Sequence, residues 1–496
     1  MPTRARATGT QSKIMSAQPF SGRSMTMDAE RLLNKGIRDL TPYPRNARTH
    51  SKKQIRQIAD SIKKFGFTNP VLIDEHDRIL AGHGRVEAAK LLGMDQVPCR
   101  LIASLSEAEK RAYILADNKL ALNAGWDEEI LAIELQFLIE QAPEIDIGLT
   151  GFSISEIDDL IDIGGTRDDS DPRDDRVPAI DSGAVATTEA GDVWLLGDHR
   201  LVCGDAQEAD SYRLLMTAGD RIERAQMVFT DPPYNVPIDG HVGGAGKIRH
   251  REFAMASGEM SRDGFTAFLS TVIGHLASFS VDGSIHFLCM DWRHLMEMQR
   301  AGEAHYSDLK NLIVWVKDNG GMGSFYRSRH ELIFAWKAGT APHINSFELG
   351  QKGRYRTNIW NYRGISSGGR TAREELALHP TVKPVAMVAD AMKDCSSRGG
   401  IVLDPFCGSG TILIAAQKVG RRARAMEIDP HYCDTAILRW QQFAKDDAVL
   451  AATGETFAAV RARRAAERLQ HQIPDELPDT AAPTPGSNGE RLISHE

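Results

Sequence analysis

Between about residues 191 and 445, short apolar runs alternate with longer amphipathic segments, and this alternation limits the folds that the chain can adopt. Two of the apolar runs end at a carboxylate that proline follows: residues 228–230 lead into Asp231, and residues 401–403 lead into Asp404. Strands that alternate with helices predict a largely parallel sheet with helices on both faces. Open sheets of this kind bind ligands at the carboxyl ends of their strands. We therefore expect an α/β domain with its functional site at that edge.

A smaller α+β unit is expected before this domain. Residues 52–65 place apolar side chains at spacings of three and four, which predicts a helix. Strands are expected over 71–74 and before Ala81, and a helix from Gly82–Arg85 to Leu92. Two further helices are expected over 106–122 and 127–140.

Composition sets the expected boundaries. Residues 164–190 are acidic and rich in Gly, Pro, Ser and Asp, so they cannot bury much apolar surface and predict a linker. The expected order is a disordered tail (1–36), the small domain (37–126), a helical extension (127–163), the acidic linker (164–190), the α/β domain (191–445) and a mostly disordered tail (446–496).

Charge and cysteine usage narrow the class of protein. The six cysteines form no C-x-x-C pair, which argues against a metal site and disulfides and predicts a reducing, cytoplasmic setting. No apolar run is long enough for a membrane span. The net charge is −8, yet residues 310–373 hold 11 Lys/Arg against 3 Asp/Glu. Such a local positive field suits a phosphate backbone.

The segment Asp231-Pro232-Pro233-Tyr234 is the sharpest local motif. Two consecutive prolines continue neither a strand nor a helix, so they predict a rigid loop after the strand. Asp231 and the Pro232 carbonyl would accept the two hydrogens of an amine, and Tyr234 would stack on the ring that carries it. An incidental turn is the alternative interpretation.

A glycine-rich turn follows the second strand, in Asp404-Pro405-Phe406-Cys407-Gly408-Ser409-Gly410-Thr411. Gly408 and Gly410 let the backbone approach a ligand at the end of the strand. Glu427 ends the next strand, where a carboxylate suits the two hydroxyls of a ribose. Asp205 ends an earlier strand and could reach an adenine amine, while Thr381 and Lys383 could meet a carboxylate of the same cofactor.

In this order, the motifs resemble the permuted β class of amino-group DNA methyltransferases (the N6-adenine/N4-cytosine family) over residues 191–445. His379-Pro380-Thr381-Val382-Lys383-Pro384, directly before the glycine-loop strand, is typical of that family, as is His330-Glu331. The resemblance implies a Rossmann-like fold that binds S-adenosyl-L-methionine, with Asp231, Pro232, Pro233 and Tyr234 as the catalytic loop. The cofactor-binding residues it implies are Asp205, Thr381, Lys383, Asp404, Phe406, Cys407, Gly408, Gly410, Thr411 and Glu427.

The family carries target recognition at about residues 338–378, where basic and aromatic side chains interleave here. We expect Lys352, Arg354, Arg356 and Arg363 to contact double-stranded DNA, which would associate the protein with the nucleoid; a solvated basic loop is the alternative.

The small domain resembles the N-terminal domain of ParB-type partition proteins and sulfiredoxin, through Leu40-Thr-Pro-Tyr-Pro-Arg-Asn46 and Ala81-Gly-His-Gly-Arg85. Arg85 at a helix start predicts a phosphate site for a nucleotide. His83 and Gly84 replace two charged residues of the partition-protein motif, and His83 replaces the sulfiredoxin cysteine.

The sequence therefore predicts methyl transfer to the exocyclic amine of a flipped base, adenine N6 foremost. N4-cytosine methylation, methylation of RNA or a protein amide, and a ParB-like DNA-binding adaptor with an inactive methylase half remain as alternatives. Cytosine C5 methylation is disfavoured because no Pro-Cys nucleophile is present. The oligomeric state is open.

Overall fold

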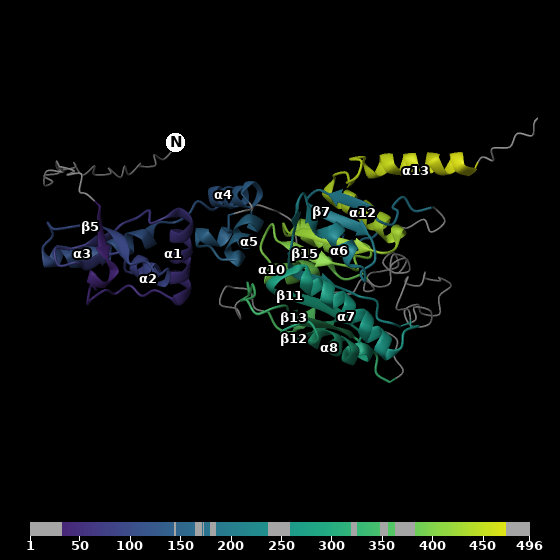
Figure 1. The fold of residues 1–496 in the computed structure, drawn as a ribbon, viewed down its shortest axis with the longest axis horizontal. Coiled ribbons are helices and arrows are strands. Elements are labelled where there is room, and N and C mark those ends of the chain that lie inside the picture. The colour runs from purple at the N-terminus through teal and green to yellow at the C-terminus, as the bar shows by residue number, and fades with distance from the viewer. Residues whose placement is uncertain are drawn as a thin grey trace, which may run out of the picture. The chain divides into compact units, whose positions relative to one another are not determined.

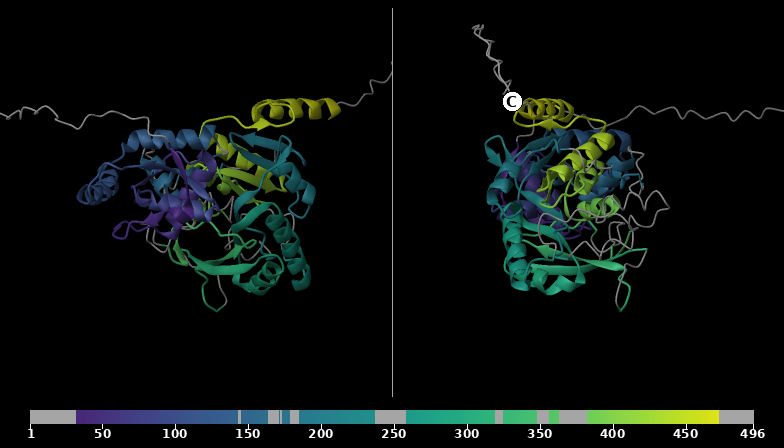
Figure 2. Two further views of the ribbon diagram at one scale, coloured as in Figure 1. Left: turned by 60° about the vertical axis from the view of Figure 1, so that its left-hand side comes forward. Right: turned by 90° about the vertical axis from the view of Figure 1, so that its right-hand side faces the viewer.

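The computed structural model describes residues 32–142, 145–163, 171, 173–178, 185–236, 258–318, 325–347, 356–362 and 382–472. Contacts within the chain define two units (Figures 1 and 2). One unit comprises Met1–Trp126 with Leu149–Gly151, and the other comprises Asp127–Gly148 with Phe152–Glu496.

The first unit is a mixed sheet with helices, as the sequence predicted. Its described strands pair in the order β1-β5-β3-β4-β2, and β3 runs parallel to β5. Val71, Ile73 and Val97 are fully buried at its centre. The elements are β1 (Leu33–Gly36), β2 (Thr41–Pro42), α1 (Lys52–Phe65), β3 (Val71–Ile73), β4 (Arg78–Ala81), α2 (His83–Leu91), β5 (Gln96–Leu101) and α3 (Glu107–Asn123).

The second unit is built on a sheet whose described strands pair in the order β14-β12-β13-β11-β10-β15-β16-β7-β6-β17. The five strands β11, β10, β15, β16 and β7 are mutually parallel, whereas β13 runs antiparallel to both β11 and β12. The strands are β6 (Val193–Leu196), β7 (His199–Cys203), β10 (Ala225–Thr230), β11 (Ser280–Met290), β12 (Asp308–Val316), β13 (His330–Lys337), β14 (Ile359–Asn361), β15 (Ile401–Asp404), β16 (Arg422–Glu427) and β17 (Val449–Leu450).

Helices cover both faces of this sheet. Alternate residues of β10 point to opposite faces, so Met227 and Phe229 join one core while Val228 joins the other. The helices are α6 (Ala209–Met216), α7 (Arg262–Ser278) and α8 (Leu295–Glu303) on the Val228 face, with α10 (Val385–Cys395), α11 (Thr411–Lys418) and α12 (Pro430–Ala444) on the other. The predicted α/β architecture of a methyltransferase with a small α+β domain before it is confirmed.

The expected helical extension forms α4 (Glu128–Gln141) and α5 (Ile154–Ile163), and both belong to the second unit. Asp158 on α5 pairs with Arg421, whose side chain is fully buried. The two helices are therefore part of the larger unit, which begins at Asp127 apart from residues 149–151, and not at residue 191 as expected.

The expected acidic linker also differs from the prediction where it is described. Asp174 forms an ion pair with the buried Lys418, and the carboxylate of Asp175 accepts the backbone N–H of Val385. Thr187 and Thr188 are buried. The acidic composition predicted that this segment is not buried, because burying an unpaired carboxylate is unfavourable. In the structure, each of these two carboxylates forms a hydrogen bond or an ion pair with the α/β unit.

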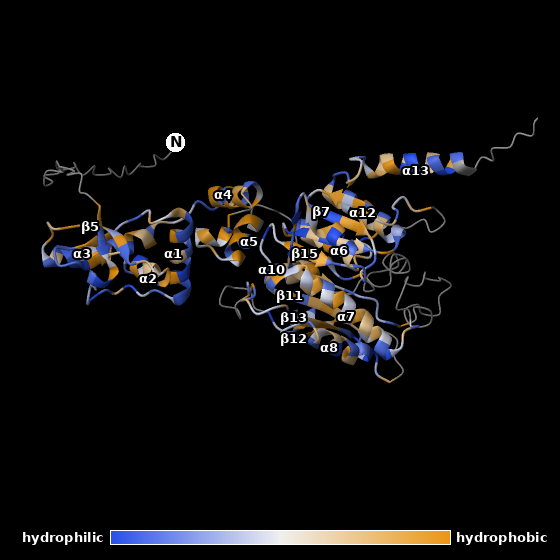
Figure 3. Cartoon of the chain, viewed as in Figure 1, coloured by the Kyte–Doolittle hydropathy of each residue, from blue (hydrophilic) through white to orange (hydrophobic). Residues whose placement is uncertain are grey.

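The tail expected to be mostly disordered from residue 446 forms regular structure over residues 449–472. β17 extends the sheet, and α13 (Phe457–Gln472) buries Phe457 and Val460. Arg464 on this helix pairs with Asp192 at 2.5 Å. Hydrophilic and hydrophobic residues alternate along α13, as expected for a helix with one buried stripe (Figure 3).

Candidate functional site

The predicted site residues gather at one edge of the large sheet. The chain passes outward from β10 to β11 on one side and from β15 to β16 on the other, so β10 and β15 form the switch point of the sheet. Open α/β sheets bind ligands outside the carboxyl ends of their strands at such a point. Asp231 follows β10 and Asp404 ends β15, which places both predicted loops at that position.

A hydrogen bond joins the two strands at this edge. The Thr230 hydroxyl donates to Oδ1 of Asp404 at 2.7 Å, and the Phe406 N–H donates to the same oxygen at 3.0 Å. Burial raises the pKa of Asp404 to about 7, although both donors act to lower it. The start of the glycine-rich loop is thus fixed to the strand that carries Asp231.

Asn235 holds the end of the catalytic loop. Its φ is +52°, a region that Asn tolerates better than most residues. Its side-chain oxygen accepts the N–H groups of Gly258 and Met260, each at 3.1 Å, and its amide donates to the Met260 carbonyl. Pro232 is buried, whereas Pro233 and Tyr234 are half-buried. Hydrogen bonds of Thr230 and Asn235 therefore fix both ends of the segment that was predicted to be rigid.

The side chain of Lys383 packs against the predicted catalytic loop. Its Nζ is 2.5 Å from Oδ2 of Asp231, 3.0 Å from Oε2 of Glu331 and 3.3 Å from the Tyr234 hydroxyl. That hydroxyl donates to Oδ1 of Asp231 at 2.5 Å. Lys317 completes the group through an ion pair with Glu331. We expected Lys383 to meet a cofactor carboxylate, and in the structure it bridges two protein carboxylates.

The two carboxylates differ in their proton affinity. Burial raises the pKa of Asp231, and Lys383 offsets this only in part. Burial also acts on Glu331, but Lys383 and Lys317 together hold its pKa well below the usual range. Burial would lower the pKa of Lys383, yet Asp231 and Glu331 raise it. Glu331 is therefore the more firmly ionised of the two acids.

The glycine-rich loop closes onto Glu427. The Gly408 N–H donates to Oε2 of Glu427 at 2.8 Å, and the Asp429 N–H donates to Oε1 at 3.0 Å. Burial raises the pKa of Glu427 to about 7 despite these donors. Asp429 also caps α12 through the His431 N–H, as the sequence suggested.

Both predicted glycines of this loop have positive φ, and at Gly410 a side chain would also clash. Gly408 has φ +52°, and a Cβ there would meet no atom within 4 Å, so the space beside it is open to a ligand. Gly410 has φ +86°, and its Cβ would lie 2.9 Å from the Cβ of Ala436. The buried Arg439 braces the loop by donating to the Ser409 carbonyl and to the Thr411 hydroxyl. An open cradle beside a buried carboxylate with ribose-binding chemistry fits S-adenosylmethionine.

The other predicted residues fall into two groups. Asp205 follows β7, and the neighbouring Gly204 N–H donates to the Glu427 carbonyl at 2.9 Å, so this strand end lies beside the cofactor loop. Cys407 is buried, and its N–H donates to the Met426 carbonyl. Thr381, Lys352, Arg354 and Arg363 lie outside the described residues.

Arg356, a predicted DNA contact, is engaged within the protein. It pairs with Asp394 at 2.9 Å and with Asp390 at 3.5 Å, and its guanidinium lies over the ring of Trp360. Trp360 is buried, and the Tyr362 carbonyl accepts the indole N–H of Trp315. These basic and aromatic side chains attach residues 356–362 to the α/β unit. The sequence pattern alone could not distinguish this structural role from a DNA-binding surface.

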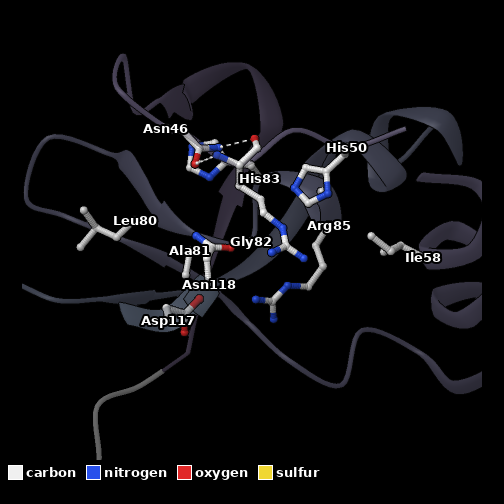
Figure 4. A pocket seen from close by; sticks show the side chains of 12 residues that line it. Asn46, His50, Ile58, Leu80, Ala81, Gly82, His83, Arg85, Asp117 and Asn118 are labelled. Atoms are coloured by element: carbon white, nitrogen blue, oxygen red, sulfur yellow. Dashed lines mark hydrogen bonds between the residues drawn. The ribbon is translucent and has the colours of Figure 1, made fainter. Parts of the chain in front are cut away.

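The first unit contains a separate pocket of about 160 Å³, with Arg85, His50 and His83 among the side chains around it (Figure 4). Nη1 of Arg85 donates to the carbonyls of Asn69 and Pro70 at 2.8 and 3.1 Å. Burial lowers the pKa of Arg85. His83 accepts the backbone N–H of Tyr43 through Nε2, which fixes the ring at the start of α2. Arg85, the predicted phosphate ligand, therefore lines a pocket and also hydrogen-bonds to the neighbouring backbone.

Sequence reasoning missed Glu331, Lys317, Asn235 and Thr230 as parts of the site. Glu331 was noted only within a family motif. A usable signal existed in the topology: because β13 is antiparallel to β11, its first residues lie at the edge where the parallel strands end. That pairing could not be read from one sequence.

Comparison with known proteins identifies the families that parts of the chain match. Residues 225–438 match the DNA methylase family model, residues 24–119 the ParB N-terminal domain and residues 129–189 the ParB-methyltransferase HTH domain. Residues 225–438 therefore form a DNA methylase domain of the N6/N4 amino-methyltransferase family, and residues 24–119 form a ParB-like domain before it. Members of this family use S-adenosylmethionine as methyl donor.

Individual relatives match parts of the chain. The ParB-like nuclease domain-containing protein YnaK of Escherichia coli K12 is 49% identical over 81 residues, covering 16% of this chain and 93% of that protein. Type II methyltransferase M.ScaI of Streptomyces caespitosus is 36% identical over 93 residues, covering 19% of this chain and 31% of its own length. The solved PvuII DNA methyltransferase (cytosine-N4-specific) is 13% identical, with a TM-score of 0.36, over 53% of this chain and 94% of that one. A likeness this distant carries no information about the target base.

The segment that matches the HTH model is unusual in its charge. The matched residues 129–189 hold 16 Asp/Glu against 3 Arg and no Lys. DNA contacts need cations to replace the counterions of the phosphates, so this surface does not suit a duplex. Asp158 instead binds two arginines of the α/β unit, Arg421 and Arg398. In this chain, α5 acts as a structural clamp on that unit.

Proposed function

We propose that this protein transfers a methyl group from S-adenosylmethionine to the exocyclic amine of a base flipped out of double-stranded DNA, and that the base is adenine. The observation that carries the proposal is the hydrogen bond of 2.7 Å between Thr230 and Asp404. It fixes the amine-binding loop and the cofactor loop side by side at the switch point of one sheet. A donor and an acceptor bound there would meet without further rearrangement of the strands.

The protein's part in the reaction is mainly positioning. Asp231 and the Pro232 carbonyl accept the two N–H groups of the target amine, so that its lone pair points toward the cofactor, and Tyr234 stacks on the base. When bound, S-adenosylmethionine supplies a methyl group on a sulfonium; the new N–C bond forms as the C–S bond breaks and its electrons pass to sulfur. Asp231, whose pKa burial raises, is the nearest base for the proton that the nitrogen then loses.

Adenine is favoured by the acid before Pro-Pro-Tyr, since serine at that position is typical of N4-cytosine enzymes in the family that the sequence resembles. N4-cytosine is the second candidate, because the same pair of acceptors would hold its amine. Lys352, Arg354 and Arg363 remain the proposed DNA contacts. Arg356 is assigned to holding its own segment, because its charge is compensated by Asp390 and Asp394.

Replacing Asp231 by Ala tests the proposal. We expect methyl transfer from labelled S-adenosylmethionine to DNA to disappear while S-adenosylhomocysteine still binds, because Asp231 contacts the amine and not the cofactor. Asp198→Ala is the matched control: this acid is exposed in the turn before β7, at the opposite edge of the sheet. Activity of Asp231→Ala within about tenfold of wild type, under about 1.4 kcal/mol of barrier, would contradict the assignment.

We also propose that the first unit binds a nucleotide phosphate in the pocket around Arg85, and that it modulates DNA binding without taking part in methyl transfer. The pocket of about 160 Å³ and its cationic lining favour this second activity. Calorimetric titration of the full chain with CTP and with ATP should give binding that Arg85→Ala weakens. Equal affinity in Arg85→Ala and wild type, for either nucleotide, would contradict the assignment.

A further inference from the structure

Four charged side chains form one continuous series of contacts beside the catalytic loop: Lys317, Glu331, Lys383 and Asp231. The side chains of Lys383 and Glu331 are 7% and 16% exposed, so water contributes little to their solvation. The series alternates in sign and contains two cations and two anions. Such a group is stable only if every member keeps a partner of opposite charge.

The resting contacts of Asp231 conflict with its proposed task. Oδ1 already accepts the Tyr234 hydroxyl at 2.5 Å, and Oδ2 accepts Lys383 at 2.5 Å. Each oxygen can accept one more hydrogen bond, but a target amine bound at Oδ2 competes with Lys383 for the same carboxylate and weakens that contact. A buried ammonium that simply lost its carboxylate would cost several kcal/mol, a penalty that would oppose base binding.

Glu331 offers a second carboxylate to Lys383. Its Oε2 already lies 3.0 Å from Nζ of Lys383, and its Oε1 is engaged by Lys317. Lys317 follows the end of β12, and Glu331 is the second residue of β13, so two adjacent strands fix the carboxylate in place. Trp315 lies beneath both ammonium groups, with Nζ of Lys317 and of Lys383 at 4.7 and 5.8 Å from its ring.

We propose that Glu331 is a positioning residue for methyl transfer: it retains Lys383 when Asp231 turns to the target amine, so that base binding leaves no unpaired buried cation. This inference rests on the proposed function of Asp231. Glu331 is not proposed to touch the base or the cofactor; it acts through Lys383, although its Oε2 also lies 3.2 Å from the Tyr234 hydroxyl. The firm ionisation of Glu331 supports this, because a protonated acid could not take over the ammonium.

The charge of Glu331 also acts on Asp231. The negative charge of Glu331 raises the pKa of Asp231, while Lys383 lowers it. Removing that negative charge should lower the pKa of Asp231 and extend activity to lower pH. Removing the cation of Lys317 should have the opposite effect, because the charge of Glu331 is then less compensated. A carboxylate without electrostatic coupling to Asp231 would give no such pair of opposite shifts.

The experiment measures kcat and KM for DNA between pH 5 and 9 in the full-length protein and four variants. Glu331→Gln should lower kcat about 10- to 100-fold, as expected when a reacting group is mispositioned, and should move the acid limb of the kcat profile to lower pH. Lys317→Met should move that limb to higher pH, and Glu331→Asp should recover part of the lost kcat. Affinity for S-adenosylhomocysteine should stay within about twofold in all variants, which is a small free-energy change.

Glu223→Gln is the matched control, because Glu223 is a largely buried carboxylate that also pairs with two cations, Arg422 and Arg424. It should leave the acid limb of the profile unmoved. The inference would be overturned if Glu331→Gln kept the wild-type kcat. It would also be overturned if kcat fell but the acid limb stayed unmoved in both Glu331→Gln and Lys317→Met. In either case the wild-type activity would still support the proposed function. A wild-type protein that transfers no methyl group to DNA would overturn both.

Discussion

Replacing Asp158 by Asn should strongly destabilise the α/β unit, although this residue lies far along the chain from every predicted site residue. Asp158 is 2% exposed and binds Arg421 through two hydrogen bonds of 2.9 and 2.8 Å. It also pairs with Arg398 at 3.0 Å. Asparagine keeps the shape but removes the charge, so the fully buried guanidinium of Arg421 loses its counter-ion.

Loss of one partner of a buried ion pair costs about 3–5 kcal/mol. For a unit of this size that corresponds to a fall of about 4–9 °C in melting temperature. Circular dichroism during heating of the full chain would measure it. Glu134→Gln on the exposed side of α4 is the control, with an expected change of at most about 0.5 kcal/mol. A fall of less than about 2 °C in Asp158→Asn would refute the assignment of α5 as a structural clamp.

Three further predictions follow from the same structure. Gly408→Ala should weaken S-adenosylhomocysteine binding in calorimetry, because the added Cβ enters the open cradle. It should also cost about 1–2 kcal/mol of stability, because the residue has a positive φ. Unchanged affinity would place the cofactor elsewhere. Because the folded-state pKa of Glu427 is raised from 4.5 to about 7, its contribution to stability is present below pH 4.5 and is lost as the pH rises through 7. The melting temperature should therefore fall less between pH 5 and 8 in Glu427→Gln, and identical slopes would contradict this. A chain that starts at Asp127 should fold and transfer methyl groups. A chain that starts at Thr187 should be less stable, because it lacks Asp158. If the chain from Asp127 is folded and binds cofactor but is inactive, the first unit is part of the catalytic machinery.

The sequence was sufficient for those parts of the fold that local rules decide. Ser51 and Ser106 cap α1 and α3, which begin within one residue of the helix starts expected at 52 and 106, and Gly410 ends the loop at a positive φ that favours glycine. The strands around Asp231 and Asp404 could be predicted because each reads as a short apolar run ending in a polar turn. Nothing local indicated that α4 and α5 pack on the larger unit, because that depends on a pair between Asp158 and Arg421, 263 residues apart.

The candidate site was predictable only to the extent that motifs carried it. Asp231, Gly408 and Glu427 stand at strand ends that the sequence marks plainly. The role of Lys383 was not predictable, since its contacts come from a loop after β10 and from the start of β13. Arg356 shows the reverse case: its basic and aromatic neighbours suggested a DNA surface, but long-range carboxylates on α10 bind it instead.

Identification of the methylated nucleoside tests the central claim most directly. Purified full-length protein is incubated with S-adenosylmethionine carrying a labelled methyl group and with mixed-sequence duplex DNA, and the digested nucleosides are separated by mass spectrometry. The proposed function, with the acid before Pro-Pro-Tyr favouring adenine, predicts label in N6-methyldeoxyadenosine and none in that nucleoside from Asp231→Ala. Label in N4-methyldeoxycytidine would correct the target base alone. The absence of label from every nucleoside, with protein that is folded and binds S-adenosylhomocysteine, would contradict the account.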